Sequence, residues 1–201
     1  MCSSDLSAPS CGLALVEDYP RLLGTPQSEV LARHIRDIHE YVLTMLEADP
    51  ELRARLKPVP VRLTYHNPCH MQARGLGDSV VRLLSLVPGV EVVPIVQDHC
   101  CGIAGTFGMK EKNFALSMHM GRPLFESIEQ TGVGVVATGC GTCKIQIEQG
   151  AGLPVIHPIR IVRDALLGGP LPPRVAAASA RRACAPVATE VPRDEASACP
   201  E

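Results

Sequence analysis

Apolar side chains recur at helical spacing between residues 30 and 46. The positions concerned are Val30, Leu31, Ile35, Ile38, Val42, Met45 and Leu46. Thr25 and Pro26 form a typical helix start, with threonine at the N-cap and proline at the first helical position. The pattern predicts one amphipathic helix over residues 25–48, with His34 and His39 on its exposed surface.

Four short runs rich in apolar and β-branched residues follow, and stretches with helical patterning lie between them. The runs cover 61–65, 90–96, 133–138 and 154–157, and the helical stretches cover 74–86, 110–130, 143–149 and 159–167. Strands that alternate with helices indicate βαβ units. We therefore expect an α/β fold with a mostly parallel sheet and flanking helices.

The two ends of the chain have a different character. Residues 1–24 show no sustained periodicity, and Gly169-Pro170 opens a segment rich in Ala, Pro and Arg. Such a composition offers too little apolar surface to offset the entropy cost of ordering. We expect residues 168–201 to be a disordered tail, and we assign no role to Cys184 or Cys199.

Composition narrows the possible classes of protein. Of the 201 residues, 46% are hydrophobic and 20% are charged, as in ordinary globular proteins, and the net charge of −2 gives no reason to expect a nucleic-acid partner. No transmembrane segment is expected, because no stretch approaches about 18 uncharged apolar residues. The N-terminus lacks the pattern of a secretory signal, so we expect a cytoplasmic location. In a reducing compartment, nine cysteines indicate metal or redox chemistry.

Five of the cysteines fall into three groups, and each group comes just after a predicted strand. The groups are Cys69, the pair Cys100 and Cys101, and the pair Cys140 and Cys143. In an open parallel sheet, the loops at the carboxyl ends of the strands share one edge and form the binding crevice. The five thiols are therefore expected to converge on one site.

Convergent thiolates repel one another unless a cation or a cluster lies between them. Soft thiolate sets select zinc, copper(I) or iron–sulfur clusters. Structural zinc needs four ligands, so five cysteines with two adjacent suit a multi-iron cluster better. Nearby glycines would let the backbone approach and donate N–H groups to sulfur. The glycines expected to do so are Gly102, Gly105, Gly139 and Gly141.

Other interpretations of these residues remain open. Four of the five thiolates could form a zinc-binding structural or interaction module. Cys140-Gly-Thr-Cys143 could alternatively be a thioredoxin-type dithiol. The glycines between 102 and 108 do not have the spacing of a dinucleotide-binding loop. Histidines at or near strand ends are candidates for orienting a ligand rather than binding the metal themselves. They are His66, His70, His99 and His157.

Three motifs together resemble a known family. They are Asn67-Pro68-Cys69-His70, then Cys100-Cys101-Gly102 continuing to Gly108, then Gly139-Cys140-Gly141-Thr142-Cys143. They resemble the CCG cysteine-rich domain, which occurs in the B subunit of heterodisulfide reductase and in iron–sulfur subunits of glycolate, lactate and glycerol-3-phosphate dehydrogenases. The longer match, which includes Lys144 to Glu148 and His157-Pro158, favours the anaerobic glycerol-3-phosphate dehydrogenase group.

The resemblance implies a non-cubane 4Fe–4S cluster with Cys69, Cys100, Cys101, Cys140 and Cys143 as ligands. It also implies an electron relay from a flavoprotein dehydrogenase subunit towards a quinone or another membrane-associated acceptor, so that the chain would be peripheral on the inner membrane. Substrate oxidation would take place in the flavoprotein, and this chain would have no catalytic residues of its own.

The chain also departs from the family pattern. Family members usually carry two ferredoxin-type cysteine runs and a first CCG repeat, which this chain lacks. We therefore expect a C-terminal fragment in which residues 1–24 are the remnant of a preceding CCG repeat, 25–167 form the CCG domain and 168–201 form the tail. Cys11 would then belong to a second site whose other ligands are absent.

Overall fold

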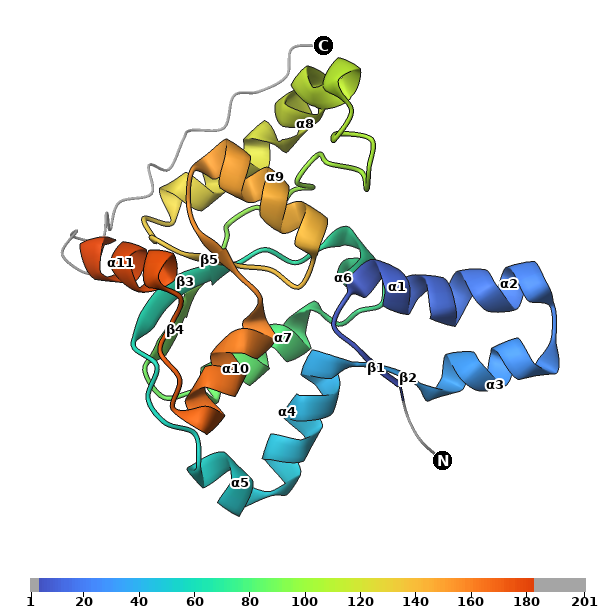
Figure 1. Cartoon of the computed structure of the whole chain (residues 1–201), viewed down its shortest axis with the longest axis horizontal. Coiled ribbons are helices and arrows are strands. Elements are labelled where there is room, and N and C mark those ends of the chain that lie inside the picture. Colours follow the sequence, from blue (N-terminus) through green and yellow to red (C-terminus); the bar gives the residue numbers. More distant parts are fainter. Residues whose placement is uncertain (1–3, 183–201) are drawn as a thin grey trace, which may run out of the picture.

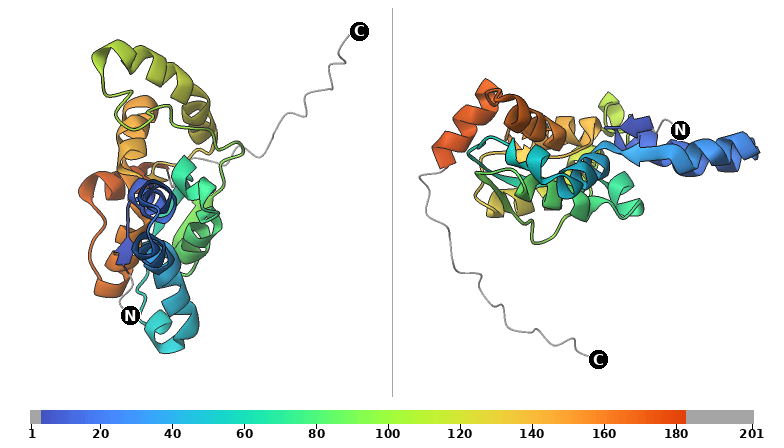
Figure 2. Two further views of the ribbon diagram at one scale, coloured as in Figure 1. Left: turned by 90° about the vertical axis from the view of Figure 1, so that its right-hand side faces the viewer. Right: turned by 90° about the horizontal axis from the view of Figure 1, so that it is seen from below.

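The computed structural model describes residues 4–182, and they form an α/β fold around a parallel sheet (Figures 1 and 2). The four strands of the main sheet are β3 (Val61–Tyr65), β4 (Val90–Val93), β5 (Val136–Ala137) and β6 (Val155–Ile156). Their order is β4-β3-β5-β6, and every neighbouring pair is parallel. The predicted fold class is confirmed.

Helices connect these strands, as parallel pairing requires. They are α6 (Cys69–Ala73) and α7 (Gly77–Ser85) between β3 and β4, α8 (Glu111–Gln130) between β4 and β5, and α9 (Gly141–Ala151) between β5 and β6. Two more helices, α10 (Pro158–Leu167) and α11 (Pro173–Arg182), follow β6. One apolar cluster joins strand β3 to helices α4, α7 and α10, and it includes Leu46, Leu63 and Leu84. A second joins β5 and β6 to α8 and α9, and it includes Ile128 and Ile147. The sheet is therefore held by two apolar clusters, which pack it against separate sets of helices.

The prediction of a single helix over 25–48 is wrong. The structure has α3 (Pro26–His34), the short strand β2 (Ile35–Asp37) and α4 (Ile38–Ala48). Thr25 caps α3 as expected, because its side chain accepts a hydrogen bond from the Ser28 amide. Strand β2 interrupts the helix because its backbone pairs in parallel with β1 (Ser4–Leu6). The Asp37 carboxylate then caps α4 by accepting from the His39 amide, as acidic N-caps commonly do.

The N-terminal segment forms a helical hairpin that projects from the body (Figure 1). It consists of α1 (Pro9–Leu13), the π-helical turn η1 (Ala14–Asp18) and α2 (Tyr19–Leu23), and it returns along α3. Helix α1 packs against α6, which begins at Cys69. This contact places the N-terminal hairpin close to the cysteine-bearing edge of the sheet. A further short helix, α5 (Pro50–Ala54), leads from α4 into β3.

Part of the segment expected to be disordered has regular structure. Residues 173–182 form α11, and Val175 of this helix is buried against the cluster around β3. The expectation rested on average composition, whereas Val175, Ala178 and the neighbouring Leu171 supply the apolar contact that holds the helix. The rest of the predicted tail, 183–201, lies outside the described residues, as do Cys184 and Cys199. Within residues 4–182, no helix is long and apolar enough to cross a membrane.

Candidate metal centre

The parallel sheet brings the three cysteine groups to one edge. Cys69 begins α6 shortly after β3, Cys100 and Cys101 lie in the loop after β4, and Cys140 is the N-cap residue of α9 after β5. Because β4, β3 and β5 are adjacent and parallel, these positions all lie beyond the carboxyl ends of their strands. The expectation that residues up to 74 positions apart would meet holds in the folded chain.

The sulfur atoms themselves are in contact or interact electrostatically. Cys101 Sγ lies 3.2 Å from Cys143 Sγ, and Cys143 also hydrogen-bonds the Cys140 thiolate. The negative charges of Cys100, Cys101 and Cys140 raise the pKa of Cys69. All five predicted cysteines therefore belong to one group. Cys11 is exposed on α1 and has no sulfur contact in the described part of the chain.

Exposure differs across the five thiols. Cys101, Cys140 and Cys143 are buried, whereas Cys69 and Cys100 are exposed. The site is therefore closed on the side of α9 and open towards Cys69 at the start of α6 and Cys100 in the loop after β4.

The thiol pKa values reflect this crowding. A hydrogen bond from Cys143 is the largest influence on Cys140, and with the Thr142 hydroxyl and the first amides of α9 it outweighs burial and lowers the Cys140 pKa to about 5. Cys143 also hydrogen-bonds Cys101, which lowers the pKa of Cys101 and raises that of Cys143. Burial, followed by the neighbouring Cys100 charge, raises the pKa of Cys69. The thiols are thus close enough that the negative charge of one disfavours ionisation of its neighbours. A bound cation relieves this repulsion.

Backbone amides donate to the sulfurs, although mostly not from the expected glycines. The Gly102 amide donates to Cys100 Sγ at 3.4 Å, as predicted for that residue. Other backbone amides also stabilise the thiolates. The Ile103 amide acts on Cys101, and the His70 amide acts on Cys69. The amides of Thr142 and Cys143 act on Cys140. The sequence reasoning missed these amides because they carry no distinguishing side-chain signal.

Gly102 has a second role that its motif does not reveal. Its φ of +84° is unfavourable for other residues, and a Cβ there would lie 2.3 Å from Ser117 O and 2.6 Å from Gly121 N. Ser117 in turn donates to the Gly102 carbonyl and accepts from Gln146. The loop that carries Cys100 and Cys101 is thereby held against α8. By contrast, a Cβ on Gly105 or Gly141 would meet no atom within 4 Å, while one on Gly139 would meet His39 and Met71.

His66 and Asp98 form a polar pair beside the thiols. His66 Nδ1 lies 2.6 Å from Asp98 Oδ1, and Asp98 Oδ2 accepts the Asn67 amide at 2.7 Å. One nitrogen of His66, Cys101 Sγ and Cys143 Sγ all lie within 4.8 Å of one another. Burial opposes the charged imidazole, but the Asp98 carboxylate and the Cys101 thiolate outweigh it and raise the pKa of His66 to about 9. The sequence reasoning singled out His66 but missed Asp98, which lies 32 residues away.

The remaining histidines lie outside the sulfur group. His70 follows Cys69 and interacts through its amide, and His99 lies 3.3 Å from the Gln97 side chain. His157 caps α10 and stacks on His39. The prediction that His39 is a surface residue is wrong, because its side chain is fully buried and pairs with Asp37 at 2.8 Å.

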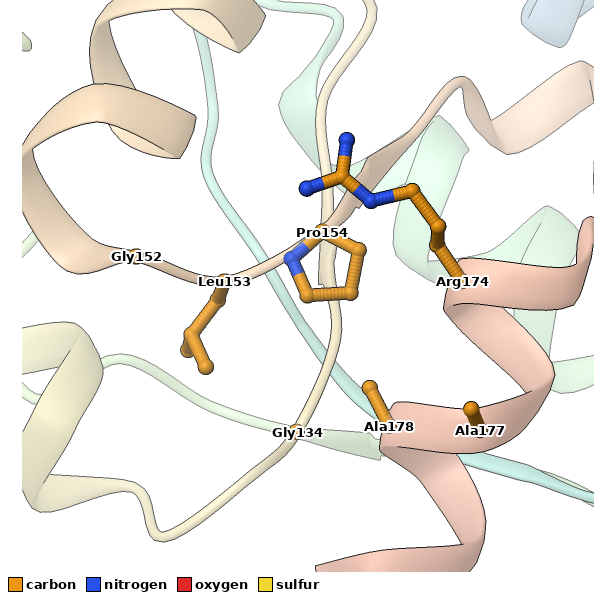
Figure 3. Close-up of a pocket in the computed structure, with 7 residues that line it drawn as sticks. All are labelled: Gly134, Gly152, Leu153, Pro154, Arg174, Ala177 and Ala178. Atoms are coloured by element: carbon orange, nitrogen blue, oxygen red, sulfur yellow. The ribbon is translucent and has the colours of Figure 1, made fainter.

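One large cavity lies away from the thiols. A cavity of about 430 Å³ lies between α11 and the amino ends of β5 and β6, the opposite edge of the sheet (Figure 3). It is lined by Gly134, Gly152, Leu153, Pro154, Arg174, Ala177 and Ala178. Its walls offer one charged group, Arg174, and no thiol or imidazole. This cavity therefore offers no candidate metal ligand.

The cysteine motifs and their arrangement match a known family model over residues 63–148, that of the CCG "Cysteine-rich domain". This stretch is a CCG cysteine-rich domain. It begins within β3 and ends within α9, so it contains all five thiols and His66. The matched stretch lies inside the predicted domain of residues 25–167 and is shorter than that domain.

Proteins similar to this chain include subunits of oxidoreductases. It is 38% identical over 160 residues to the C subunit of anaerobic glycerol-3-phosphate dehydrogenase from Escherichia coli K12, covering 80% of this chain and 39% of that protein. It is 30% identical over 140 residues to the B subunit of fumarate reductase (CoM/CoB) from Methanothermobacter marburgensis, covering 69% of this chain and 26% of that protein. It is 33% identical over 165 residues to the lactate utilization protein A of Geobacillus thermodenitrificans, covering 78% and 65%. The chain thus spans between about a quarter and two thirds of the length of these relatives.

Proposed function

We propose that this chain holds one iron–sulfur cluster and transfers electrons within an oxidoreductase complex. The observation that carries the proposal is the gathering of five cysteine sulfurs at one edge of the sheet, with Cys101 and Cys143 only 3.2 Å apart. Soft thiolate donors in this number suit a multi-iron cluster. The similarity to subunits of glycerol-3-phosphate dehydrogenase and fumarate reductase supports a redox role.

The proposed ligands are Cys69, Cys100, Cys101, Cys140 and Cys143. A cubane four-iron cluster takes four cysteines, whereas five thiolates, two of them adjacent in sequence, favour the non-cubane four-iron type. The residues present fit such a group, because three sulfurs are buried against α9 and amide N–H groups point at Cys100, Cys101 and Cys140. When bound, the cluster would supply one-electron transfer.

The chain's own residues would hold the cluster and set its potential. The Thr142 hydroxyl, 3.2 Å from Cys140 Sγ, and the first amides of α9 would stabilise the Cys140 thiolate. Gly102 and Ile103 would do the same for the adjacent cysteine pair. Hydrogen bonds to sulfur, burial and net charge are the factors by which a protein tunes cluster potential. The exposed thiols Cys69 and Cys100 leave a side on which a redox partner could approach.

The partners proposed are a flavoprotein dehydrogenase, with glycerol-3-phosphate as its substrate, and a quinone or membrane-associated acceptor. The basis is the 38% identity to a subunit of anaerobic glycerol-3-phosphate dehydrogenase. Weaker similarity to lactate utilization protein A and to the fumarate reductase (CoM/CoB) protein leaves a lactate, glycolate or heterodisulfide system as the alternative. In either case the chain would act in the cytoplasm or at the inner face of the membrane.

A zinc module is the second candidate, and one observation favours it. His66, Cys101 and Cys143 present one nitrogen and two sulfurs within 4.8 Å of one another, and His66 pairs with a carboxylate, as zinc-binding histidines usually do. With a fourth thiolate this set would satisfy tetrahedral zinc. Zinc would leave at least one of the five cysteines unused.

Metal analysis separates the two candidates. Iron, acid-labile sulfide and zinc are measured per chain after anaerobic purification and reconstitution with iron and sulfide. About four iron and four sulfide per chain, with a brown colour, are expected for one four-iron cluster. About one zinc without sulfide would replace the electron-transfer proposal with the structural module.

Matched cysteine variants locate the site. Cys101→Ser removes a buried sulfur that contacts Cys143, so iron and sulfide should fall well below wild-type levels. Cys11→Ser changes an exposed cysteine on α1 and should leave the iron content unchanged. Equal iron content in both variants would contradict the assignment of Cys101 as a ligand.

A further inference from the structure

The imidazole of His66 is fixed in place from two sides. Its ring is 1% exposed, and its Nδ1 lies 2.6 Å from Asp98 Oδ1. Asp98 is itself held, because its Oδ2 accepts the Asn67 amide at 2.7 Å. The His66 backbone N–H donates to the Ala137 carbonyl, which ties this position to β5. The ring therefore has one orientation, set by the carboxylate and by the sheet.

The other ring nitrogen of His66 is unsatisfied. Nε2 is buried and has no hydrogen-bond partner among residues 4–182. Buried polar groups in folded proteins nearly always have partners, so the unsatisfied Nε2 needs an explanation. One nitrogen of the ring lies within 4.8 Å of the sulfurs of Cys101 and Cys143. Because Nδ1 is paired with Asp98, Nε2 is the nitrogen that is left to interact with these sulfurs.

The neighbours on both sides of the ring are hydrogen-bond acceptors. Asp98 is a carboxylate whose second oxygen accepts the Asn67 amide, so its Oδ1 accepts from Nδ1–H. On the other side, the Cys101 thiolate is an acceptor. Because Cys101 is only 3% exposed, water cannot donate a hydrogen bond to its sulfur. The protonated ring, an imidazolium, donates from both nitrogens and so serves both acceptors.

We propose that His66 is a positioning residue that donates an Nε2–H hydrogen bond to the Cys101 sulfur when the cluster is bound, with Asp98 holding the ring. This inference rests on the proposed iron–sulfur function. A hydrogen bond to a ligand sulfur stabilises the more negative, reduced state of the cluster and so raises its midpoint potential. Asp98 acts indirectly, by fixing the ring orientation, as outer carboxylates do for histidines at metal sites.

The test is the midpoint potential of the reconstituted 201-residue chain and four variants, at one fixed pH, with iron and sulfide measured in each. His66→Leu removes the donor, and its potential should be more negative than that of the wild type. His66→Gln keeps an N–H near the Nε2 position, and its potential should lie closer to the wild type than that of the leucine variant. Asp98→Asn should lower the potential in the same direction by a smaller amount. His119→Gln, on the exposed surface of α8, should not change it.

Each contrary result has a distinct meaning. A wild-type potential in His66→Leu at full iron content would overturn the inference while leaving the cluster proposal intact. Strong nitrogen coupling to iron by electron–nuclear double resonance, lost in His66→Leu, would overturn it by making His66 a ligand. If His66→Leu does not load iron, Asp98→Asn decides: a lowered potential supports the hydrogen bond, and an unchanged one overturns it. Absence of iron from the wild type would overturn both proposals.

Discussion

The imidazole ring of His39 stacks on that of His157, with ring centroids 5.1 Å apart and an interplanar angle of 17°. His39 lies in the first turn of α4 and is fully buried, while His157 is the N-cap residue of α10. The stack therefore joins the N-terminal segment to the start of α10, the helix that follows the last strand of the sheet. Three further contacts support it: Asp37 pairs with His39, the His157 ring accepts from the Ile159 amide, and its other nitrogen donates to the Ser7 carbonyl.

His157→Ala should destabilise the protein by about 2 kcal/mol. The substitution removes an N-cap worth about 1 kcal/mol and a ring contact worth about 0.5–1.5 kcal/mol. His157→Asn should recover the capping part, because asparagine is a good N-cap residue. Urea unfolding monitored by circular dichroism measures both. A loss no larger than that of His119→Ala, a change at an exposed site expected to fall within about 0.5 kcal/mol, would contradict the role given to His157.

Acid should weaken the fold through Asp37. Burial alone would raise the pKa of Asp37, but the hydrogen bond and charge of His39 outweigh burial and lower the pKa below its ordinary value of 3.8. A carboxyl whose folded pKa is depressed stabilises the protein above its unfolded pKa, and that stabilisation is lost as the pH falls through the folded pKa. The urea midpoint of the wild type should therefore fall as the pH is lowered below about 4.

Asp37→Asn isolates this contribution. At pH 7 the variant should be less stable than the wild type by about 1–3 kcal/mol, because a buried charged hydrogen bond is replaced by a neutral one. As the pH decreases towards about 3, the difference should shrink, because the wild-type carboxyl loses its charge. A difference that stays constant or grows as the pH falls would show that Asp37 is not the group responsible. Glu111→Gln, at an exposed position in α8, is the matched control.

Two glycines of the cysteine loop should respond differently to alanine. Gly102→Ala places a methyl group 2.3 Å from Ser117 O and should force the loop away from α8, at a cost above about 2 kcal/mol for clash and positive φ together. Gly105→Ala has the same φ sign, +63°, but its methyl group meets nothing within 4 Å, so about 1 kcal/mol is expected. Urea unfolding measures the cost, and iron content after reconstitution should fall further in Gly102→Ala. Equal effects would mean that the contact with α8 does not hold the loop.

The Glu148 carboxylate should contribute more than an ordinary surface ion pair. It pairs with Lys144 and accepts the Val155 amide at 3.1 Å, so it ties α9 to β6. Glu148→Ala should cost about 1–2 kcal/mol, since it removes a charge-assisted hydrogen bond to the backbone. Glu126→Ala breaks the exposed pair with Arg122 on α8 and should cost only about 0.3–0.5 kcal/mol. Chemical denaturation compares the two, and similar losses would argue against the tie to β6.

Local patterns along the chain were enough to predict most elements of the sheet and its helices. Strand β3 and helices α8 and α10 lie within a few residues of their predicted ranges, because their apolar periodicity reflects which side chains are buried. The convergence of the five cysteines also followed from the sequence. Parallel strands place their following loops at one edge, so the order of strands and cysteine groups was sufficient.

Only the tertiary structure decided which polar residues share that edge and the neighbouring core. The pairing of His66 with Asp98 and the stack of His39 on His157 join positions 32 and 118 residues apart, and no periodicity encodes such pairs. The break at Ile35–Asp37 likewise depends on pairing with β1, which overrides helix propensity. The sequence determined which thiols gather at that edge, through cysteine identity and position. The amides and the histidine that face the sulfurs were set by the chain packing around them, because hydrogen-bond partners depend on distance in space.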